Sequence, residues 1–364
     1  MVAPLPVLPR WWCGRQAAGW YEGSLQVAEP LARQVAHEVG SGVDDSAFHT
    51  GSSRFDGEWA LGTHQMAVMG LAQFALAHPE QADEVLPAIE VAVDRLLSPE
   101  MRAFGTAAWR EDGLAPDATG SHAYLGYLNI ALGMARLVIP DPDWASTHDA
   151  LTASLERRLA DAPRALVETY PGEAYPPDVS AVAGSIGLHG TATGTPHPAL
   201  APWARAFEEH YLDDSGLLVQ SALVGSGRAV DVPRASGTAI AAYFTSFSDP
   251  MLSTRLHGGV ERGAISVLGF GAVREYPPGH LGLGDIDSGP VLLGLGVSAT
   301  GFALAGARIH QDRRLFVSLA RTAHLFGAPH DRAGRRDYVT GGPLGNAILL
   351  AMLTAGPGAA EGQP

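Results

Sequence analysis

The sequence contains almost no cysteine and few positively charged residues. Cys13 is the one cysteine among 364 residues, which excludes an intrachain disulfide and a cysteine-based metal site. Lysine and arginine total 24 against 38 acidic residues, so the formal net charge is −14. A protein that binds nucleic acid needs a basic face to displace counterions. The charge balance therefore argues against a nucleic-acid partner and against docking on an anionic membrane.

Long apolar runs are also missing. No window approaches the roughly 20 apolar residues that a membrane-spanning helix requires, so we expect no membrane insertion. Residues 1–9 contain three prolines and no basic residue before their short apolar run, which makes a poor secretion signal. We therefore expect a cytoplasmic protein.

Several motifs that mark enzyme classes are absent. We find no G-x-S-x-G nucleophile elbow and no P-loop. The glycine-rich stretch 269–289 has no βαβ unit before it, which argues against dinucleotide binding. No pair of histidines has the spacing of metal ligands on one helix. The sequence thus predicts neither a metal site nor a cofactor.

The chain does have ample material for one large core. Hydrophobic residues make up 46% and charged residues 17% of the sequence, which also holds 44 glycines and 26 prolines. We expect a single domain over residues 1–356 and a flexible tail over residues 357–364.

Apolar helices recur along the chain, each followed by a more polar one. Six apolar segments are expected to begin 53 to 63 residues apart, at Glu58, Ser121, Pro177, Ser236, Gly289 and Pro343. Five amphipathic segments lie between them, beginning near Glu80, Asp143, Ala199, Asp249 and Asp312. The N-terminal amphipathic stretch from Ser24 to Val39 supplies a sixth.

This pattern predicts an all-α fold, an (α/α)6 barrel of six inner and six outer helices. A helix that is apolar around most of its circumference must be buried, and an amphipathic helix covers it. The apolar segments carry glycine pairs such as Gly62 and Gly70 or Gly184 and Gly187. Glycine costs about 1 kcal/mol inside a helix, and close helix approach around a narrow ring would compensate for it. The alternative is an irregular solenoid of stacked hairpins. Short hairpins are expected in loops, at Leu217–Val224 and Gly269–Tyr276.

The inner helices of such a ring run in one direction, so their N-termini share one face, the mouth. Long loops on a rigid scaffold commonly carry function, and the long junctions are on this side. We predict Glu58, Asp178 and Asp287 as catalytic carboxylates. For Asp56, Asp285 and Ser288, helix capping alone explains the residue type.

Aromatic residues and histidines gather at the same junctions. Their rings could stack on sugar faces or shelter a positively charged transition state. The aromatic set includes Tyr127 and Tyr170. The predicted substrate-binding residues are Trp59, His64, Trp109, His122, Tyr124, Tyr175, Tyr243, Glu275 and Tyr276. His189, His197 and His210 are expected toward the opposite end or the outer layer.

The segments 55–80, 175–178, 234–250 and 284–308 together resemble bacterial proteins grouped near linalool dehydratase/isomerase. A broader similarity links the architecture to glycoside hydrolases and glucuronyl C5-epimerases. The resemblance implies an (α/α)6 fold and cofactor-free proton transfer by acidic and tyrosine side chains. The linalool enzyme also uses a cysteine pair, whereas this chain has only Cys13.

Three functional hypotheses follow. The first is a cofactor-independent lyase, isomerase or cyclase that acts on a small, largely apolar substrate such as a terpenoid alcohol. Asp178 or Asp287 would protonate the leaving hydroxyl, and Glu58 or a tyrosine would take the later proton. The second is a glycoside hydrolase or sugar epimerase with a carboxylate pair in a wet polar groove. The third is a non-catalytic binding scaffold. A homo-oligomer is possible in each case.

Overall fold

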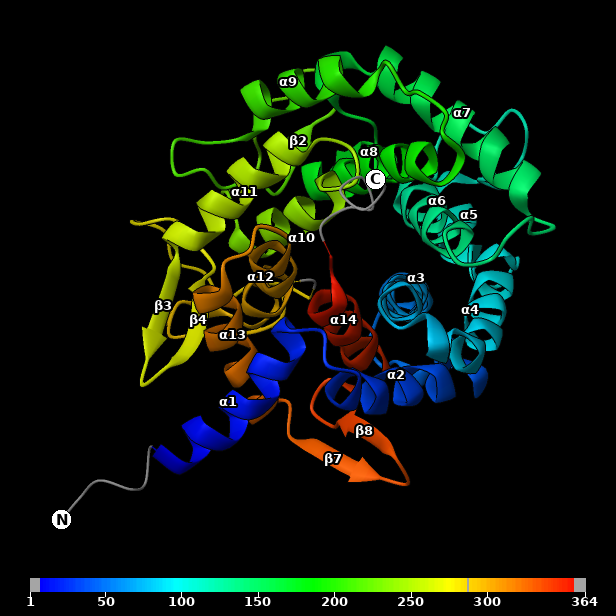
Figure 1. The fold of residues 1–364 in the computed structure, drawn as a ribbon. Helices are drawn as coiled ribbons and strands as arrows, with labels where there is room; N and C mark the ends of the chain where they lie inside the picture. Colours follow the sequence, from blue (N-terminus) through cyan, green and yellow to red (C-terminus); the bar gives the residue numbers. More distant parts are fainter. Residues whose placement is uncertain (1–6, 287, 357–364) are drawn as a thin grey trace.

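The computed structural model describes residues 7–286 and 288–356. Two concentric layers of helices form an (α/α)6 barrel, which Figure 1 shows in a view down the barrel axis. The inner helices are α3 (Ser53–Ala77), α6 (His122–Arg136), α8 (Pro176–Thr193), α10 (Ala235–Thr245), α12 (Val297–Ile309) and α14 (Gly342–Thr354). The outer helices are α2 (Leu25–Gly40), α4 (Ala82–Leu97), α7 (Ala145–Asp161), α9 (Leu200–Tyr211), α11 (Pro250–Arg262) and α13 (Arg313–Phe326). The predicted fold class is confirmed.

Two further helices lie outside this count. Helix α1 (Val7–Tyr21) packs on α13 and projects from the edge of the ring, and α5 (Ala103–Trp109) is a short helix beside α3. Single 3-10 turns are η1 (Asp45–Ala47), η2 (Pro79–Gln81) and η3 (Pro163–Ala165). Among the described residues, no helix has the length and apolar character to cross a membrane.

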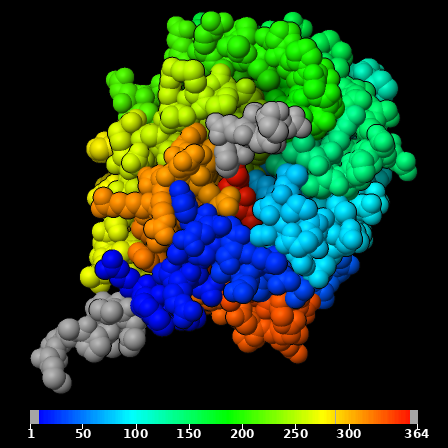
Figure 2. Space-filling model, viewed as in Figure 1, coloured from blue at the N-terminus to red at the C-terminus, as the bar shows by residue number. Residues whose placement is uncertain are grey.

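The ring closes between the first and last inner helices. The side-chain amide of Gln73 on α3 donates to the Ala351 carbonyl on α14, at 2.9 Å. A Cβ at Gly70 would lie 2.8 Å from the Ala351 nitrogen, so the two backbones approach as only glycine allows. The same holds between α8 and α10, where a Cβ at Gly184 would lie 2.4 Å from the Phe244 carbonyl oxygen. These contacts explain why inner helices tolerate glycine. In the space-filling view, only a small part of α14 (red) is visible between its neighbours (Figure 2).

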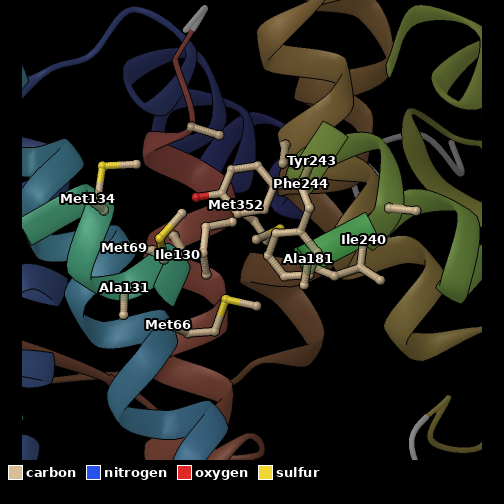
Figure 3. Close-up of a cluster of buried hydrophobic side chains, with 14 of the residues drawn as sticks. Met66, Met69, Ile130, Ala131, Met134, Ala181, Ile240, Tyr243, Phe244 and Met352 are labelled. Atoms are coloured by element: carbon tan, nitrogen blue, oxygen red, sulfur yellow. The ribbon is translucent and has the colours of Figure 1, made fainter. Parts of the chain in front are cut away.

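Apolar side chains fill the middle of the barrel (Figure 3). They come from five of the inner helices and are all less than a tenth exposed. The labelled members are Met66, Met69, Ile130, Ala131, Met134, Ala181, Ile240, Tyr243, Phe244 and Met352. The lumen is therefore packed at this level.

The strands lie in loops. β1 (Glu173–Ala174) pairs with β2 (Ala222–Leu223), and β7 (Pro329–Arg332) pairs with β8 (Arg335–Tyr338). A four-stranded antiparallel sheet has the order β3 (Ala264–Val267), β4 (Phe270–Arg274), β6 (Leu295–Gly296), β5 (Val291–Leu292). The expected hairpin around Gly269–Tyr276 is thus part of a larger sheet, and the strand within Leu217–Val224 pairs with residues that precede α8.

The largest error among the predicted helix starts is just over two turns. The fifth inner helix begins at Val297 and not near Gly289, because the β5–β6 hairpin occupies the intervening residues. Leu293 and Gly294 adopt positive φ angles of 54° and 82° at its tip, which ends any helix there. Gly294 therefore lies in the hairpin turn and Gly296 in strand β6, and neither belongs to an inner helix.

Candidate active site at the mouth of the barrel

Glu58 lies in the second turn of α3, where a tyrosine from another junction reaches it. The Tyr170 hydroxyl donates a hydrogen bond to the Glu58 carboxylate. The Arg54 guanidinium lies 3.7 Å from the same carboxylate and stacks over the Tyr170 ring, 4.3 Å from its centre. Burial, together with the negative charges of Glu58 and Asp178, raises the pKa of Tyr170 above its usual range. Tyr170 therefore keeps its proton and remains a donor at neutral pH.

Asp178 lies in the first turn of α8, directly after Pro176 and Pro177. Proline suits the first helical positions because its φ is already helical and its missing N–H leaves no bond unmade. An acidic side chain in that turn is also favoured by the helix dipole. The Tyr127 hydroxyl on α6 donates to an Asp178 oxygen at 2.7 Å. The Tyr127 ring in turn packs edge-on against Phe244, 5.7 Å between centres.

A third carboxyl group lies beside these two. The Tyr175 hydroxyl donates to Glu173 at 3.1 Å, and Arg54 lies 3.9 Å from Glu173. Burial, followed by the charge of Glu173, raises the pKa of Tyr175 to about 12. We call the set of Arg54, Glu58, Tyr127, Tyr170, Glu173, Tyr175 and Asp178 the carboxylate–tyrosine site.

This site combines three carboxyl groups and three tyrosine hydroxyls with one guanidinium. Both Glu58 and Asp178 act on the pKa of Tyr170, so both carboxyl groups lie near one hydroxyl. Such a set can donate a proton, accept one, and stabilise a positive charge that develops between the carboxylates.

Arg234 organises the junctions before α10 and α12. Its guanidinium pairs with the carboxylates of Asp231 and Asp285 and lies 5.8 Å from the centre of the Tyr276 ring. Burial alone would raise the pKa of Asp285, but the Ser288 N–H and Arg234 outweigh it and hold that pKa below its usual range. The Ser288 N–H donates to Asp285 at 2.8 Å. Asp285 therefore closes a loop and does not cap a helix as predicted, because α12 begins only at Val297.

Glu275 is fully buried one residue before Tyr276. One carboxylate oxygen accepts the Ser236 hydroxyl, and the other, Oε2, has no hydrogen-bond partner. Burial raises the pKa of Glu275 to about 7, although Ser236 and Arg234 act against the shift. Its backbone carbonyl accepts the Ala235 N–H at 2.8 Å. Glu275 thus links the start of α10 to the segment that follows β4 through hydrogen bonds. The sequence had predicted it as a substrate contact.

Three other predicted substrate-binding residues lie in the core. His64 contacts the Val43 carbonyl at 2.8 Å, the Tyr124 hydroxyl donates to the Leu96 carbonyl at 2.6 Å, and the Tyr243 hydroxyl donates to Gln73 at 2.9 Å. All three are at most 1% exposed. In this structure the three side chains make the contacts of core residues, and their contact with a substrate stays a prediction.

The remaining predicted residues are at the rim. Trp59 packs edge-on against Phe48 at 5.8 Å, and Trp109 packs edge-on against His122 at 6.3 Å. One His122 nitrogen contacts the Glu168 carbonyl at 2.6 Å. Tyr175 and Tyr276 are half-buried, the first beside Glu173 and the second beside the Arg234 guanidinium. The predicted catalytic residue Asp287 lies outside the described residues.

The structure adds partners that the sequence did not assign. Tyr127 and Tyr170 were expected only as aromatics of the mouth, and Arg54 and Glu173 were not assigned to the site. Their signal in the sequence is the same position before an inner helix. Among the described residues, the groups that could hold a metal ion lie outside this site, on α7–α8 and on α11–α13.

Comparisons with known proteins support the fold. No protein-family profile matches the chain, and no curated protein is similar in sequence. An inactive variant of an α-1,6-mannanase of glycoside hydrolase family 76 from Salegentibacter sp. HEL1_6, with two adjacent aspartates replaced by alanine and α-1,6-mannotetrose bound, has a TM-score of 0.51. It is 11% identical, over 94% of this chain and 98% of that chain. The unaltered mannanase has a TM-score of 0.50 at the same identity and coverage.

A polysaccharide lyase is more distant, with a TM-score of 0.43 and 10% identity over 89% of this chain and 99% of that chain. The architecture is therefore the one used by (α/α)6-barrel enzymes such as the mannanase. Linalool dehydratase/isomerase is not among these three structures, and the terpenoid substrate expected from the sequence has no support from them.

Proposed function

We propose that this protein is a cofactor-independent acid/base enzyme that cleaves a glycosidic bond at the mouth of the barrel. The observation that carries the proposal is the carboxylate–tyrosine site, in which Glu58 and Asp178 are each held by a tyrosine hydroxyl. Paired carboxyl groups with separate partners can take the acid and the base role of glycoside cleavage.

The two carboxyl groups differ in their surroundings, which suggests their roles. Glu58 lies beside the positive charge of Arg54, which stabilises a carboxylate. We assign Glu58 as the base that takes a proton from the attacking water. We assign Asp178 as the acid that gives its proton to the leaving oxygen as the carbon–oxygen bond breaks. The water oxygen then bonds to the anomeric carbon, and the two carboxyl groups exchange protonation states over the cycle.

The mouth favours a polar substrate over the apolar one expected from the sequence. Charged side chains line its junctions, including Arg54, Glu173, Arg234 and Asp285. The barrel axis beneath is packed with apolar side chains (Figure 3), so a deep apolar funnel is not formed there. The α-1,6-mannanase structures, which share the fold, agree with a glycan substrate.

A second candidate is dehydration or isomerisation of a less polar alcohol. It is favoured by one observation: the Tyr127 ring packs edge-on against Phe244, which belongs to the methionine-rich core. In that reaction Asp178 would protonate the leaving hydroxyl, and Glu58 would take a proton from the neighbouring carbon.

The test is a substrate panel of aryl glycosides, α-linked oligosaccharides and terpenoid alcohols, with products read by mass spectrometry. We expect product from a glycoside or oligosaccharide. Asp178→Asn and Glu58→Gln should each remove turnover while the thermal midpoint stays within a few degrees. Asp56→Asn is the matched control, because the Asp56 carboxylate is occupied by Thr50. Product from terpenoid alcohols alone would replace the first proposal with the second candidate.

A further inference from the structure

Imidazole rings gather at the end of the barrel that is remote from the mouth. His148 in the first turn of α7 packs against His189 near the end of α8, with ring centres 4.8 Å apart. His197, after α8, packs on the other side of His189 at 5.1 Å. Three neighbouring imidazole rings would repel one another if all were protonated, so either a hydrogen-bond network or a bound cation must hold them together.

The geometry of this cluster matches a set of metal ligands. One ligand atom from each of His148, Asp149 and His189 lies within 4.8 Å of the other two. The His189 Nε2 atom is 2.9 Å from an Asp149 oxygen. In a tetrahedral zinc site with bonds of about 2.0–2.1 Å, neighbouring ligand atoms are roughly 3.3 Å apart. Small side-chain movements therefore suffice to receive the ion.

His197 and Glu156 orient the His189 ring. Its Nδ1 is 3.0 Å from His197 Nε2, and His197 Nδ1 is 2.8 Å from a Glu156 oxygen. Metal-binding histidines commonly engage their other nitrogen with such a partner, which fixes the tautomer and the ring orientation. The relay from Glu156 through His197 leaves His189 Nε2 facing Asp149.

His148 supplies an independent observation. It is fully buried, and its Nε2 atom has no hydrogen-bond partner. Burial, with the neighbouring His189, lowers the pKa of His148 to about 3. A buried, unpaired ring nitrogen is unfavourable unless something binds it.

Arg136, the last residue of α6, competes for the same carboxylate. Its guanidinium pairs with Asp149, and its Nη1 lies 3.4 Å from His148 Nδ1. Arg136 provides the positive charge of the cluster, and its side chain is 20% exposed. A bound cation would displace it toward solvent.

We propose that His148, Asp149 and His189 form a zinc site that ties α7 to α8. Two imidazoles and one carboxylate suit Zn²⁺ and leave a fourth position for water. The sequence predicted no metal site because it offered no ligand pair on one helix, whereas these ligands come from two helices 40 residues apart. The site is separate from the proposed glycan chemistry and stands without it.

A second group, His257, Glu261 and Asp312, serves as the comparison. Its Asp312 side chain already caps α13 by accepting the Leu315 N–H at 2.9 Å. We therefore expect this group to bind zinc much more weakly, and His257→Ala is a control that leaves the proposed site intact.

The experiment measures Zn²⁺ binding by equilibrium dialysis and Co²⁺ binding by visible absorption on the full chain. We expect one Zn²⁺ per chain, with affinity reduced about 100-fold in His148→Ala and His189→Ala, and roughly 10- to 100-fold in His197→Gln. Arg136→Gln should tighten binding, because it removes the competing cation, and His257→Ala should change nothing. Zn²⁺ should raise the thermal midpoint of the unaltered protein only where it binds.

Two results would overturn the proposal. The first is an unaltered protein and an Arg136→Gln variant that both fail to bind Zn²⁺. The second is binding that His189→Ala leaves unchanged or that His257→Ala removes. Should an alanine variant fail to fold, the opposite expected effects of His197→Gln and Arg136→Gln still decide the question.

Discussion

Tyrosine hydroxyls govern the two central carboxyl groups of the mouth. The Tyr170 hydroxyl donates a hydrogen bond to Glu58, and the Tyr127 hydroxyl donates one to Asp178. A hydrogen bond to a charged group contributes about 1.5–3 kcal/mol. The tyrosines therefore decide how readily each carboxylate gives or takes a proton.

Removing one hydroxyl should slow the reaction without unfolding the protein. In Tyr170→Phe, Glu58 loses the hydrogen bond from Tyr170, and we expect kcat to fall about 10- to 100-fold, as follows from that energy. Steady-state kinetics on the substrate found by the panel would measure the effect. Tyr211→Phe is the matched control, because that hydroxyl donates to the Arg164 carbonyl on the outer layer. Equal losses in the two variants would show that the Tyr170 hydroxyl has no special role.

Glu275 should make stability depend on pH. Burial raises the pKa of Glu275 in the folded protein to about 7, from an ordinary value of about 4.5. Its favourable contribution is thus complete below pH 4.5 and is lost as pH rises to 7, because only the unfolded chain ionises in that window. The shift corresponds to roughly 3 kcal/mol.

Glu275→Gln should remove this dependence, since the amide stays neutral in both states. Chemical denaturation at several pH values between 4.5 and 8 would show a flatter stability curve for the variant than for the unaltered protein. The exposed Glu90 provides the control, because Glu90→Gln should leave the slope unchanged. A slope that persists in Glu275→Gln would assign it to other groups.

Single residues also show the limits of prediction from sequence. Glu58 and Asp178 could be named because each lies within the first two turns of an inner helix. Their tyrosine partners lie 112 and 51 residues away, and such pairings depend on helix rotation and ring closure. The same unknown rotation led to Tyr243 being predicted in the substrate site, when it is buried against Gln73.

At the scale of helices and strands, close backbone contacts between neighbouring inner helices determine how tightly the ring packs. The Gly184 site on α8 meets the Phe244 carbonyl on α10, where a side chain has no space. Gly301 on α12 has no atom within 4 Å of an added Cβ. Both residues are helical glycines, but only one of them is required by packing.

These two glycines form a matched pair for mutation. We expect Gly184→Ala to destabilise the protein by about 2–3 kcal/mol through the backbone clash. Gly301→Ala should be neutral or stabilising by up to about 1 kcal/mol, because alanine favours the helix. Urea denaturation with equal m-values would measure both changes. A neutral Gly184→Ala variant would contradict the close packing of α8 on α10.

The helix starts show what periodicity can predict. Four inner helices begin within one residue of the predicted position, at α6, α8, α10 and α14. α3 begins five residues earlier than predicted, at Ser53, and α12 begins later because the β5–β6 hairpin precedes it. Two-residue strands have no periodic signal, and α1 lies outside the twelve-helix repeat, so neither could be found from the pattern.

For the whole molecule, the sequence predicted an (α/α)6 barrel whose functional face is the set of inner-helix N-termini. Carboxylates, tyrosines and arginines from distant junctions do meet there. The packed axis was not foreseen, because hydrophobic composition does not distinguish a filled lumen from an open funnel. That difference moves the proposed substrate from a terpenoid alcohol to a glycan.

The central claim is that Glu58 and Asp178 act as one catalytic pair, and a double-mutant cycle of kcat/KM tests it most directly. Residues that act as a unit are strongly non-additive. We predict that Glu58→Gln with Asp178→Asn is hardly slower than the worse single variant, at an unchanged thermal midpoint. Rate losses that multiply, or a double variant with full activity, would contradict the account.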